Sequence, residues 1–497
     1  MEEKLALDKS ISKSDYIKGL QCSKALWLSN YRKDLKLPID KKTQSLFDTG
    51  NEINDLARKC FAEGKKAADG YFDIEKSAHL TKELIEQGNQ IIFEATAIIA
   101  ADGSHARIDI LHKSEIPGKW NLIEVKGSTS VKEYHIDDMS FQYHVFSRAG
   151  YEIDKCLLML VDNSYILQGE IDPHKFFKFE DVSKQVLENQ NEVDSCKSNL
   201  LQVLKGAEEP KMKIGDKCFK PFDCDYQHHC WKEIPQYSIF NIYQNKKAEE
   251  IAVQIGSYDI KNIPQKFFPT GAKVTDINCH QGNKTHIDKD KIKGWLITLQ
   301  YPLYFLDYET LMPAIPLFES TRPYQQVPFQ FSLHIQNNPD DELQHFEYLH
   351  KEKSDPREEF IKKLIEVCGH DGSIICYNQS FEKTRNKELA EDFPQYARSL
   401  EAINRRVVDL MEPFQKRFIY SPKQQSSVSI KAVLPAFTDL NYKEMGIANG
   451  SEAMGAYLNF IKGKIADEVK LMEDLSRYCK LDTYAMTALL HILIRNS

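Results

Sequence analysis

Two short stretches, HARIDIL (residues 105–111) and NLIEVKGS (residues 121–128), decide the fold of the first half of the chain. Their side chains follow the two-residue period of β-strands. The segment between them contains Pro-Gly and can turn the chain, so the two stretches are predicted to pair as a hairpin. In that hairpin Asp109 would lie beside Glu124 and Lys126. The pairing therefore gathers two carboxylates and one ammonium at one point of a sheet.

This set of side chains suits phosphodiester hydrolysis. Two carboxylates can hold a divalent cation that polarises the phosphate and lowers the pKa of water, while the lysine positions the nucleophile or offsets charge. Downstream, residues 137–151 have helical character and carry Gln142, and an apolar strand follows. Upstream, QIIFEATAIIA alternates and places Glu94 on a strand. The alternative is that Glu-x-Lys is a cross-strand ion pair on a solvated face.

Four cysteines bracket these elements. Cys22 lies near the N-terminus, and Cys218, Cys224 and Cys230 follow about two hundred residues later with five residues between neighbours. Four thiolates from distant points of a chain can close one tetrahedral sulfur site, for zinc or for an iron–sulfur cluster. A zinc site that includes a nearby histidine is the alternative. The remaining seven of the eleven cysteines lack paired spacing and are expected to be ordinary thiols.

The pattern of Asp109, Glu124-Val125-Lys126 and Gln142 resembles the PD-(D/E)XK nuclease superfamily. The cysteine arrangement resembles the CRISPR-associated and AddB-type members, in which one upstream and three downstream cysteines hold a 4Fe–4S cluster. The resemblance covers about residues 10–235. It implies a restriction-endonuclease-like fold, with Asp109 and Glu124 as Mg²⁺ or Mn²⁺ ligands and Lys126 and Gln142 as further catalytic residues. The same resemblance implies a 4Fe–4S cluster on Cys22, Cys218, Cys224 and Cys230, with zinc as the alternative.

Two details refine this resemblance. Gln142 with Phe146 is similar to the Gln-xxx-Tyr element of the RecB-type branch, with Phe in place of Tyr. That branch often has a histidine in a helical Gly-xxx-His element as an extra metal ligand. Here the histidine is replaced by Asn54, after Gly50, and Glu52 lies nearby on the same predicted helix.

The second half of the chain has its own carboxylates. In YPLYFLDYETLMP (residues 301–313), alternation puts Asp307 and Glu309 on one face of a strand. Two acids so placed repel each other unless a cation lies between them, which makes them candidate ligands for magnesium or manganese. A long C-terminal helix is predicted from Val469, and Asp482 lies beside its apolar stripe, on the same face as Tyr478.

The intervening sequence supplies a further acid. SIICYNQSFEKTRNKELA (residues 373–390) predicts a buried strand, a turn and a helix that begins near Glu382. Asp409, in RRVVDLMEPF, is a candidate auxiliary acid, although an acid after Val-Val is also an ordinary strand end.

These residues resemble the DEDD exonucleases of the ribonuclease H-like superfamily, over about residues 300–495. Asp307 and Glu309 match the first motif, and Asn378-Gln-Ser-Phe-Glu382 resembles the second, with glutamate in place of aspartate. Tyr478 and Asp482 match the Tyr-xxx-Asp form of the third motif. The resemblance implies two metal ions about 4 Å apart, held by Asp307, Glu309, Glu382 and Asp482, with Tyr478 orienting the attacking water.

Length and composition limit the number of domains and the class of protein. The chain has 497 residues, enough for two or three domains, and a net charge of −8, which neither supports nor excludes a nucleic-acid partner. The predicted domains are residues 1–235, a linker or small subdomain at 236–298, and residues 299–497. The fold class is predicted to be α/β or α+β. The sequence shows neither a secretory signal nor an apolar run long enough to span a membrane, so a cytoplasmic location without membrane contact is expected.

The sequence thus predicts a metal-dependent nuclease with two centres, the second acting as a 3′-to-5′ exonuclease. DNA is the expected substrate, with RNA as the second possibility, and roles in DNA repair or in defence against mobile elements fit the resemblance. The alternative is a nucleic-acid-binding or interaction protein with weakened catalysis and a structural zinc or iron–sulfur site.

Overall fold

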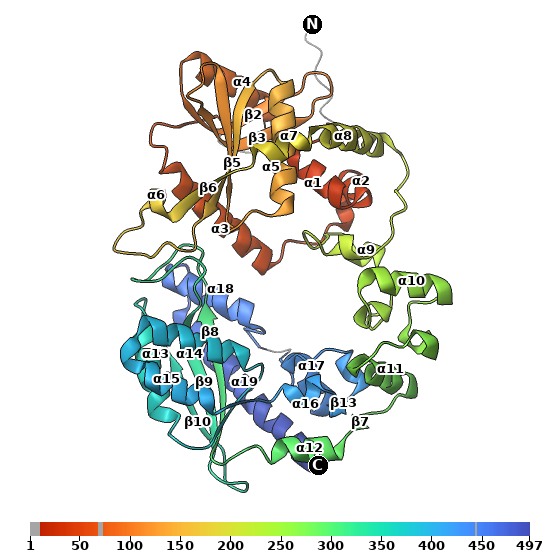
Figure 1. Ribbon diagram of the computed structural model, residues 1–497, viewed down its shortest axis with the longest axis vertical. Helices are drawn as coiled ribbons and strands as arrows, with labels where there is room; N and C mark the ends of the chain where they lie inside the picture. The colour runs from red at the N-terminus through yellow and green to blue at the C-terminus, as the bar shows by residue number, and fades with distance from the viewer. Residues whose placement is uncertain (1–9, 68–72, 443–444) are drawn as a thin grey trace. The chain divides into compact units, whose positions relative to one another are not determined.

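The computed structural model of the protein describes residues 10–67, 73–442 and 445–497. Contacts along the chain divide it into two compact units, named here unit 1 (Met1–Glu233) and unit 2 (Ile234–Ser497). Both units mix helices with β-sheets (Figure 1), so the predicted α/β or α+β class is confirmed at that level. The segment expected to be a linker or a small subdomain, residues 236–298, carries helices and an apolar cluster of its own and groups with unit 2.

Unit 1 is built on a mixed sheet with the strand order β1-β2-β3-β4-β5-β6. Its strands are β1 (Lys65–Lys66), β2 (Ile91–Ile98), β3 (His105–Lys113), β4 (Lys119–Lys126), β5 (Glu152–Val161) and β6 (Phe177–Asp181). Its α-helices are α1 (Lys13–Gln21), α2 (Ser23–Tyr31), α3 (Lys41–Arg58), α4 (Ile74–Glu86), α5 (Glu133–Arg148), α6 (Pro173–Phe176), α7 (Ser183–Glu188), α8 (Gln190–Lys205) and α9 (Gln227–Cys230).

The hairpin expected from the two opening stretches is β3–β4. These strands pair antiparallel with Ile110 opposite Ile123. Helix α5 then connects β4 to β5, which pair in parallel, as a crossover helix does in a β–α–β unit. The strand predicted around Glu94 is β2, but both of its faces are largely buried, and Glu94 has a φ of 55°. The residues of β2 therefore do not alternate between buried and exposed. Helices cover one side of the strand, and Glu94 interrupts its regular conformation.

Several contacts fix the position of helix α1. The side chain of its N-cap Ser12 accepts a hydrogen bond from the backbone N–H of Asp15, and the Asp15 carboxylate accepts one from the backbone N–H of Ser12. A Cβ added at Gly19 would lie 2.6 Å from the side chain of Leu200 on α8, so the two helices pack closely there. These constraints fix Lys13, the first residue of α1.

Unit 2 contains a second mixed sheet with the order β10-β9-β8-β11-β12. Its strands are β7 (His286–Ile287), β8 (Leu303–Leu311), β9 (Val327–Gln336), β10 (Gln344–Leu349), β11 (Ser373–Cys376), β12 (Val407–Asp409) and β13 (Ile419–Tyr420). Its α-helices are α10 (Asn245–Ile255), α11 (Ala272–Gly282), α12 (Lys289–Leu296), α13 (Arg357–Val367), α14 (Ser380–Asp392), α15 (Ala397–Arg405), α16 (Glu412–Gln415), α17 (Ile430–Phe437), α18 (Gly450–Ile461) and α19 (Glu468–Arg495).

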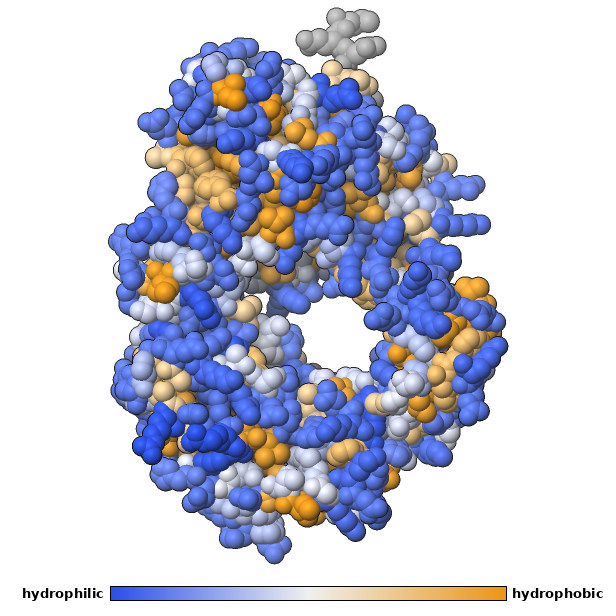
Figure 2. All heavy atoms as spheres, in the orientation of Figure 1, coloured by the Kyte–Doolittle hydropathy of each residue, from blue (hydrophilic) through white to orange (hydrophobic). Residues whose placement is uncertain are grey.

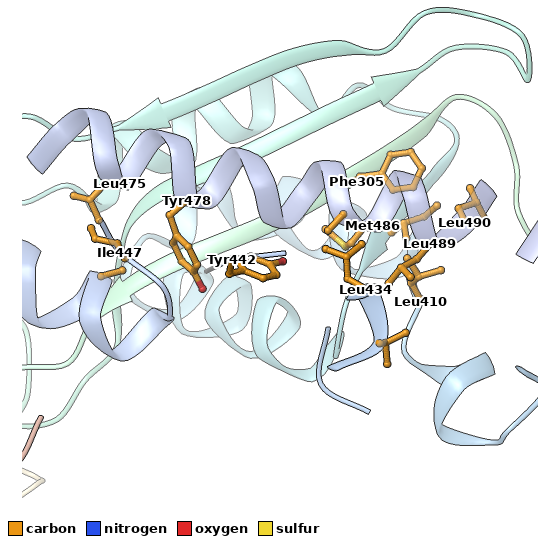
Figure 3. Packing of buried hydrophobic residues seen from close by; sticks show 14 of the residues in the cluster. Phe305, Leu410, Leu434, Tyr442, Ile447, Leu475, Tyr478, Met486, Leu489 and Leu490 are labelled. Carbon is orange, nitrogen blue, oxygen red and sulfur yellow. The ribbon is translucent and has the colours of Figure 1, made fainter. Parts of the chain in front are cut away.

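The central strand β8 is covered on both faces. Phe305 packs into the core cluster that contains the apolar residues of α19, whereas Tyr304 and Leu306 belong to the cluster that contains those of α13. Figure 3 shows Met486 and Leu489 of α19 close to Phe305 of β8. Burying both faces explains why β8 reads as a nearly continuous apolar run, broken by its acids.

The face of the molecule shown in Figure 2 is mostly hydrophilic. The apolar residues on that face form scattered spots. Within the described ranges of the chain, no helix combines the length and the apolar content needed to cross a membrane.

Candidate functional site

Three acids of unit 2 converge on one point. Asp307 and Glu309 come from β8 and Asp482 comes from α19, and one carboxylate oxygen of each lies within 4.8 Å of the others. This is the only group of at least three potential ligand residues within that separation among the residues that the structure describes. Helix α19 packs against β8 and β9, which brings residues 173 and more positions apart in sequence into one cluster.

Burial disfavours the ionised form of these three carboxyl groups, named here the acid cluster (Asp307, Glu309 and Asp482). Burial, with the charge of Asp482, raises the pKa of Glu309 to about 8. Burial raises the pKa of Asp482 to about 6, against the opposing effects of a hydrogen bond from Tyr442 and the charge of Lys431. Burial and the neighbouring acids also raise the pKa of Asp307 well above its ordinary value. Ionised together, these acids need a cation.

Glu382, the fourth predicted acid, lies in the first turn of α14 and is 2 % exposed. Its Oε2 atom has no hydrogen-bond partner in the described part of the chain. Burial, with the charge of Asp409, raises the pKa of Glu382 to about 8, and its own charge acts on Asp307 and Glu309. The structure thus leaves Glu382 outside the group of acids within 4.8 Å, although its charge acts on two of them, and a buried carboxylate oxygen without a partner is costly.

Asp409 has a different role from the auxiliary acid expected. Its carboxylate accepts hydrogen bonds from the backbone N–H groups of Asn378 (3.0 Å), Gln379 (3.3 Å) and Met411 (2.9 Å). Asn378 has a φ of 76°, a left-handed conformation that needs such support. Asp409 therefore stabilises the turn that leads from β11 into α14 and so positions Glu382.

Three further residues surround Asp482, and only one of them was predicted. Tyr478, one turn before Asp482 on α19, hydrogen-bonds to its carboxylate. Tyr442 donates a hydrogen bond of 2.6 Å to Asp482 Oδ1, and Figure 3 shows its ring beside that of Tyr478 below α19. Lys431, on α17, has its ammonium over both tyrosine rings. Tyr442 and Lys431 belong to no motif, and only the fold brings them to the site.

The predicted residues of unit 1 also meet. Asp109 Oδ2 accepts a hydrogen bond of 2.8 Å from the backbone of Val125, next to Glu124 on β4. Gln142, on α5, donates a hydrogen bond of 3.1 Å to Glu124 Oε2. Burial, with the charge of Glu124, raises the pKa of Asp109 to about 7. The hairpin and α5 thus bring together the four residues that sequence alone singled out.

Two residues that the sequence did not single out, Lys13 on α1 and Asp138 on α5, complete this group. Lys13 Nζ lies 2.7 Å from Glu124 Oε1, and Lys126 Nζ lies 2.8 Å from the same oxygen. Lys126 also contacts Asp138 on α5. Burial opposes the ionised form of Glu124, but the charges and hydrogen bonds of Lys126 and Lys13 outweigh it and hold the pKa of Glu124 below its usual range. Unit 1 therefore presents a charge-balanced ion-pair network of two lysines, Lys13 and Lys126, with two acids, Glu124 and Asp138, beside Asp109.

The segment compared with the helical Gly-xxx-His element lies on α3 of this unit. Asn54 is half-buried on α3, which packs against β4. Glu94 forms an ion pair of 2.6 Å with Arg58 of the same helix. Neither contact places a fourth carboxylate against Asp109.

The four predicted cysteines line one cavity. Cys22, at the start of α2, lies with Cys218, Cys224 and Cys230, and Lys24 borders the same cavity. Burial, with the charges of the other three thiols, raises the pKa of Cys224 to about 11. Their sulfur atoms do not form a set of three within 4.8 Å anywhere in the described ranges. A single zinc ion, with Zn–S bonds of about 2.3 Å, would need sulfurs about 3.8 Å apart.

A pocket of about 470 Å³ joins the two features of unit 1. Lys126 and Asp138 border it on the side of the network, and Cys224 borders it on the side of the cysteine cavity. The segment between them carries Phe222, whose ring packs edge-on against Tyr134 with ring centroids 5.0 Å apart. The pocket has the size of a site for a small ligand or for one unit of a polymer.

His229 does not line the cysteine cavity. A zinc site with a histidine ligand would need a histidine there. The Nε2 atom of His229 lies 3.1 Å from Glu209 Oε1, and Lys24 Nζ lies 2.6 Å from the same oxygen.

Comparison with known proteins gives a family match over part of unit 2. A family described as "Domain of unknown function (DUF2779)" matches residues 304–429, which include Asp307, Glu309 and Glu382 but not Asp482. The chain is also 22 % identical to the uncharacterized protein UU173 of Ureaplasma parvum over 551 aligned positions, covering 84 % of this chain and 79 % of that protein.

Two shorter similarities accompany it. The uncharacterized protein MG366 of Mycoplasma genitalium and its homologue in Mycoplasma pneumoniae are each 24 % identical over 223 positions, covering 40 % of this chain and 33 % of those proteins. The chain is thus similar to proteins whose names state no activity, and part of unit 2 is similar to a domain family whose description states none.

Proposed function

We propose that the chain is a divalent-metal-dependent nuclease with two centres, one in each unit. The observation that carries the proposal is the acid cluster, in which three carboxylates lie within 4.8 Å and burial raises their pKa values. Hard oxygen ligands so arranged suit Mg²⁺ or Mn²⁺. The orphaned Oε2 of Glu382 supports the same interpretation.

Each residue of the unit 2 centre has a defined task in this proposal. Asp307, Glu309, Glu382 and Asp482 would hold the metal, which when bound supplies Lewis-acid activation of water and stabilisation of the leaving oxygen. Tyr478 orients the attacking water through its hydroxyl group, and Tyr442 holds Asp482 in place through its hydrogen bond. The proposed fold of this unit is ribonuclease H-like, and the proposed reaction is 3′-to-5′ removal of nucleotides.

In unit 1 the proposed metal ligands are Asp109 and Glu124. Lys126 would position the nucleophile, and Gln142 orients Glu124 through its hydrogen bond. The proposed fold is restriction-endonuclease-like. The pocket beside Lys126 gives a polymer access to this centre, with Tyr134 and Phe222 as flat surfaces for a base.

The cysteine cavity is proposed to hold a 4Fe–4S cluster. The four thiols that line one cavity are the type of ligand that such clusters use, which supports the proposal, with zinc as the alternative. Anaerobic purification with iron, sulfide and zinc analysis tests this. An absorption band near about 400 nm with iron and sulfide is expected, and a colourless protein with stoichiometric zinc would contradict it.

One observation favours the alternative for unit 1 alone. Lys13 and Lys126 already neutralise Glu124, as in a structural ion-pair network, so this unit can be stable without metal. A binding role for unit 1 with weakened catalysis remains the second candidate function for that reason.

The test is cleavage of labelled single- and double-stranded DNA and RNA with Mg²⁺ or Mn²⁺. Lys126→Ala and Asp307→Ala are each expected to remove a separable activity, and DNA is the expected preferred substrate. Lys113→Ala and Asp290→Ala change exposed residues of the same type in the same units and serve as matched controls. If both active-centre variants cut like the parent, the two-centre assignment is wrong.

A further inference from the structure

Among the residues that the structure describes, Lys431 is a cation beside the acid cluster whose ammonium contacts the predicted tyrosine, Tyr478. Its Nζ atom donates a hydrogen bond of 2.6 Å to the backbone carbonyl of Ala448 and lies 3.4 Å from the hydroxyl oxygen of Tyr478. It also lies 5.3 Å from the ring centroid of Tyr442 and 5.1 Å from that of Tyr478. The ammonium is therefore anchored in one place by a carbonyl and two aromatic faces.

The charge of Lys431 acts on the acids themselves. The Lys431 ammonium lies 3.4 Å from the hydroxyl oxygen of Tyr478, which is one helical turn before Asp482 on α19, so a positive charge is held beside the acid cluster. A fixed positive charge at this position favours the ionised carboxylates and at the same time repels a divalent cation.

The contact with Tyr478 restricts the direction of its hydroxyl hydrogen. An ammonium has donors only, so the Tyr478 oxygen must accept from Lys431 and cannot donate to it. The phenol hydrogen then points elsewhere, and Asp482 is the acceptor to which Tyr478 hydrogen-bonds.

We propose that Lys431 is a positioning residue of the unit 2 centre: by donating to the Tyr478 oxygen it directs the phenol hydrogen toward Asp482, leaves a lone pair of that oxygen to accept from the attacking water, and limits the affinity of the acid cluster for divalent metal. This inference rests on the proposed nuclease function, to which it adds a residue outside the predicted motifs. Lys431 acts through Tyr478 and the acids, and the reaction is one of proton positioning with no covalent step on the lysine.

The charge and the hydrogen bond predict opposite effects on two measured quantities. In Lys431→Met, removal of the repulsion is expected to tighten Mn²⁺ binding by about threefold to tenfold, as titration calorimetry of the full chain measures. The same variant is expected to lower kcat about tenfold with little change in KM, since Tyr478 loses its fixed orientation. A merely structural lysine would weaken metal binding or leave it unchanged when removed.

A double-mutant cycle isolates the link to Tyr478. Lys431→Met is expected to lower kcat in the parent but to have almost no further effect on kcat in Tyr478→Phe, because the two changes remove the same arrangement. Lys431→Arg keeps the charge and is expected to restore the parental Mn²⁺ affinity. Lys423→Met, an exposed lysine shortly before it, is the matched control.

The outcomes separate this inference from the proposed function. If the parent cuts nucleic acid while Lys431→Met matches it in kcat and Mn²⁺ affinity, the inference is wrong and the nuclease proposal stands. If the parent cuts nothing but Lys431→Met still binds Mn²⁺ more tightly, the nuclease proposal is wrong and the electrostatic role of Lys431 stands. Weaker Mn²⁺ binding in Lys431→Met, or additive losses of kcat in the cycle, would overturn the inference.

Discussion

Both candidate centres contain buried carboxylates, but the charges of these carboxylates are compensated in different ways. In unit 1, Glu124 lies within 2.8 Å of two ammonium groups, so its charge is balanced within the protein. In unit 2, three acids lie within 4.8 Å of one another, and Lys431 is close but not in an ion pair with them. The comparison teaches that the carboxylate centre of unit 2 depends on protons or an added cation to be stable, whereas the carboxylate centre of unit 1 is neutralised by its own lysines. The predictions below test that difference.

The largest expected effect is in the cysteine cavity, which ties Cys22 near the N-terminus to the segment of Cys218–Cys230. Cys224→Ser is expected to destabilise unit 1 by about 5 kcal/mol, because binding free energy at a thiolate site contributes to folding. Hydrogen exchange followed by peptide mapping would show faster exchange in α1 and α2 and unchanged exchange in β8 and α19. Cys60→Ser, outside the cavity, is the control, and faster exchange in α19 would contradict the assignment.

Breaking the ion-pair network of unit 1 should be nearly as costly. Glu124→Gln leaves Lys13 and Lys126 with less compensating charge and is expected to destabilise unit 1 by about 3 kcal/mol in the absence of divalent metal. Thermal unfolding and exchange of β4 would measure it. Glu115→Gln changes an exposed glutamate in the same unit and should have little effect. A Glu124→Gln variant as stable as the parent would show that the network is not balanced as described.

The same type of substitution should have the opposite sign in unit 2. Asp307→Asn removes one of the mutually repelling charges, so it is expected to stabilise metal-free unit 2 at pH 8 by on the order of 2 kcal/mol. Differential scanning calorimetry with and without Mn²⁺ would measure the change. With Mn²⁺ present, Asp307→Asn should lose the stabilisation that the metal gives the parent. Destabilisation of metal-free unit 2 by Asp307→Asn would contradict the comparison.

The pH dependence of metal-free unit 2 follows from the same charges. The pKa values of Asp482, about 6, and of Glu309 and Glu382, about 8, are raised above their ordinary values, so the protonated acids stabilise the folded unit. That contribution is complete at low pH and is lost as pH rises through about 6 to 8, so Tm should fall over this window. Saturating Mn²⁺ should remove the fall, and a Tm of metal-free unit 2 that rises over the window would contradict it.

The smallest expected effect is in the pocket of unit 1. Phe222→Ala is expected to weaken binding of a labelled single-stranded oligonucleotide to the Asp307→Ala chain by about tenfold, because one base loses a stacking surface. Fluorescence anisotropy would measure it. Phe179→Ala removes an aromatic ring of similar exposure on β6 and is the control. Equal affinities of the Phe222→Ala and Phe179→Ala chains would show that the pocket does not receive the strand.

Local sequence patterns predicted the parts of both sites that lie on regular elements. Alternation placed Asp109, Glu124 and Lys126 on paired strands, and the helical stripe placed Asp482 on α19. These predictions depended on periods of two and of about 3.6 residues, which tertiary contacts did not override here.

The remaining site residues depend on long-range packing. Lys13 reaches Glu124 across 111 positions of sequence, and Lys431 reaches Tyr478 across 47. Neither lysine differs locally from those on an ordinary solvated helix, so only the packing of α1 and α17 reveals it. Asp409 shows the converse, since a residue of suitable chemistry is used for backbone hydrogen bonds that support a left-handed Asn378.

The central claim is that the chain cuts nucleic acid at two metal-dependent centres, and one measurement tests it most directly. The parent, Lys126→Ala, Asp307→Ala and the double variant are incubated with end-labelled single-stranded DNA and Mn²⁺, and the products are resolved by length over time. The parent is expected to cut, each single variant to lose one product pattern, and the double variant to cut at least about a thousandfold more slowly. A double variant that cuts as fast as the parent, or a parent that leaves the DNA intact, would contradict the claim.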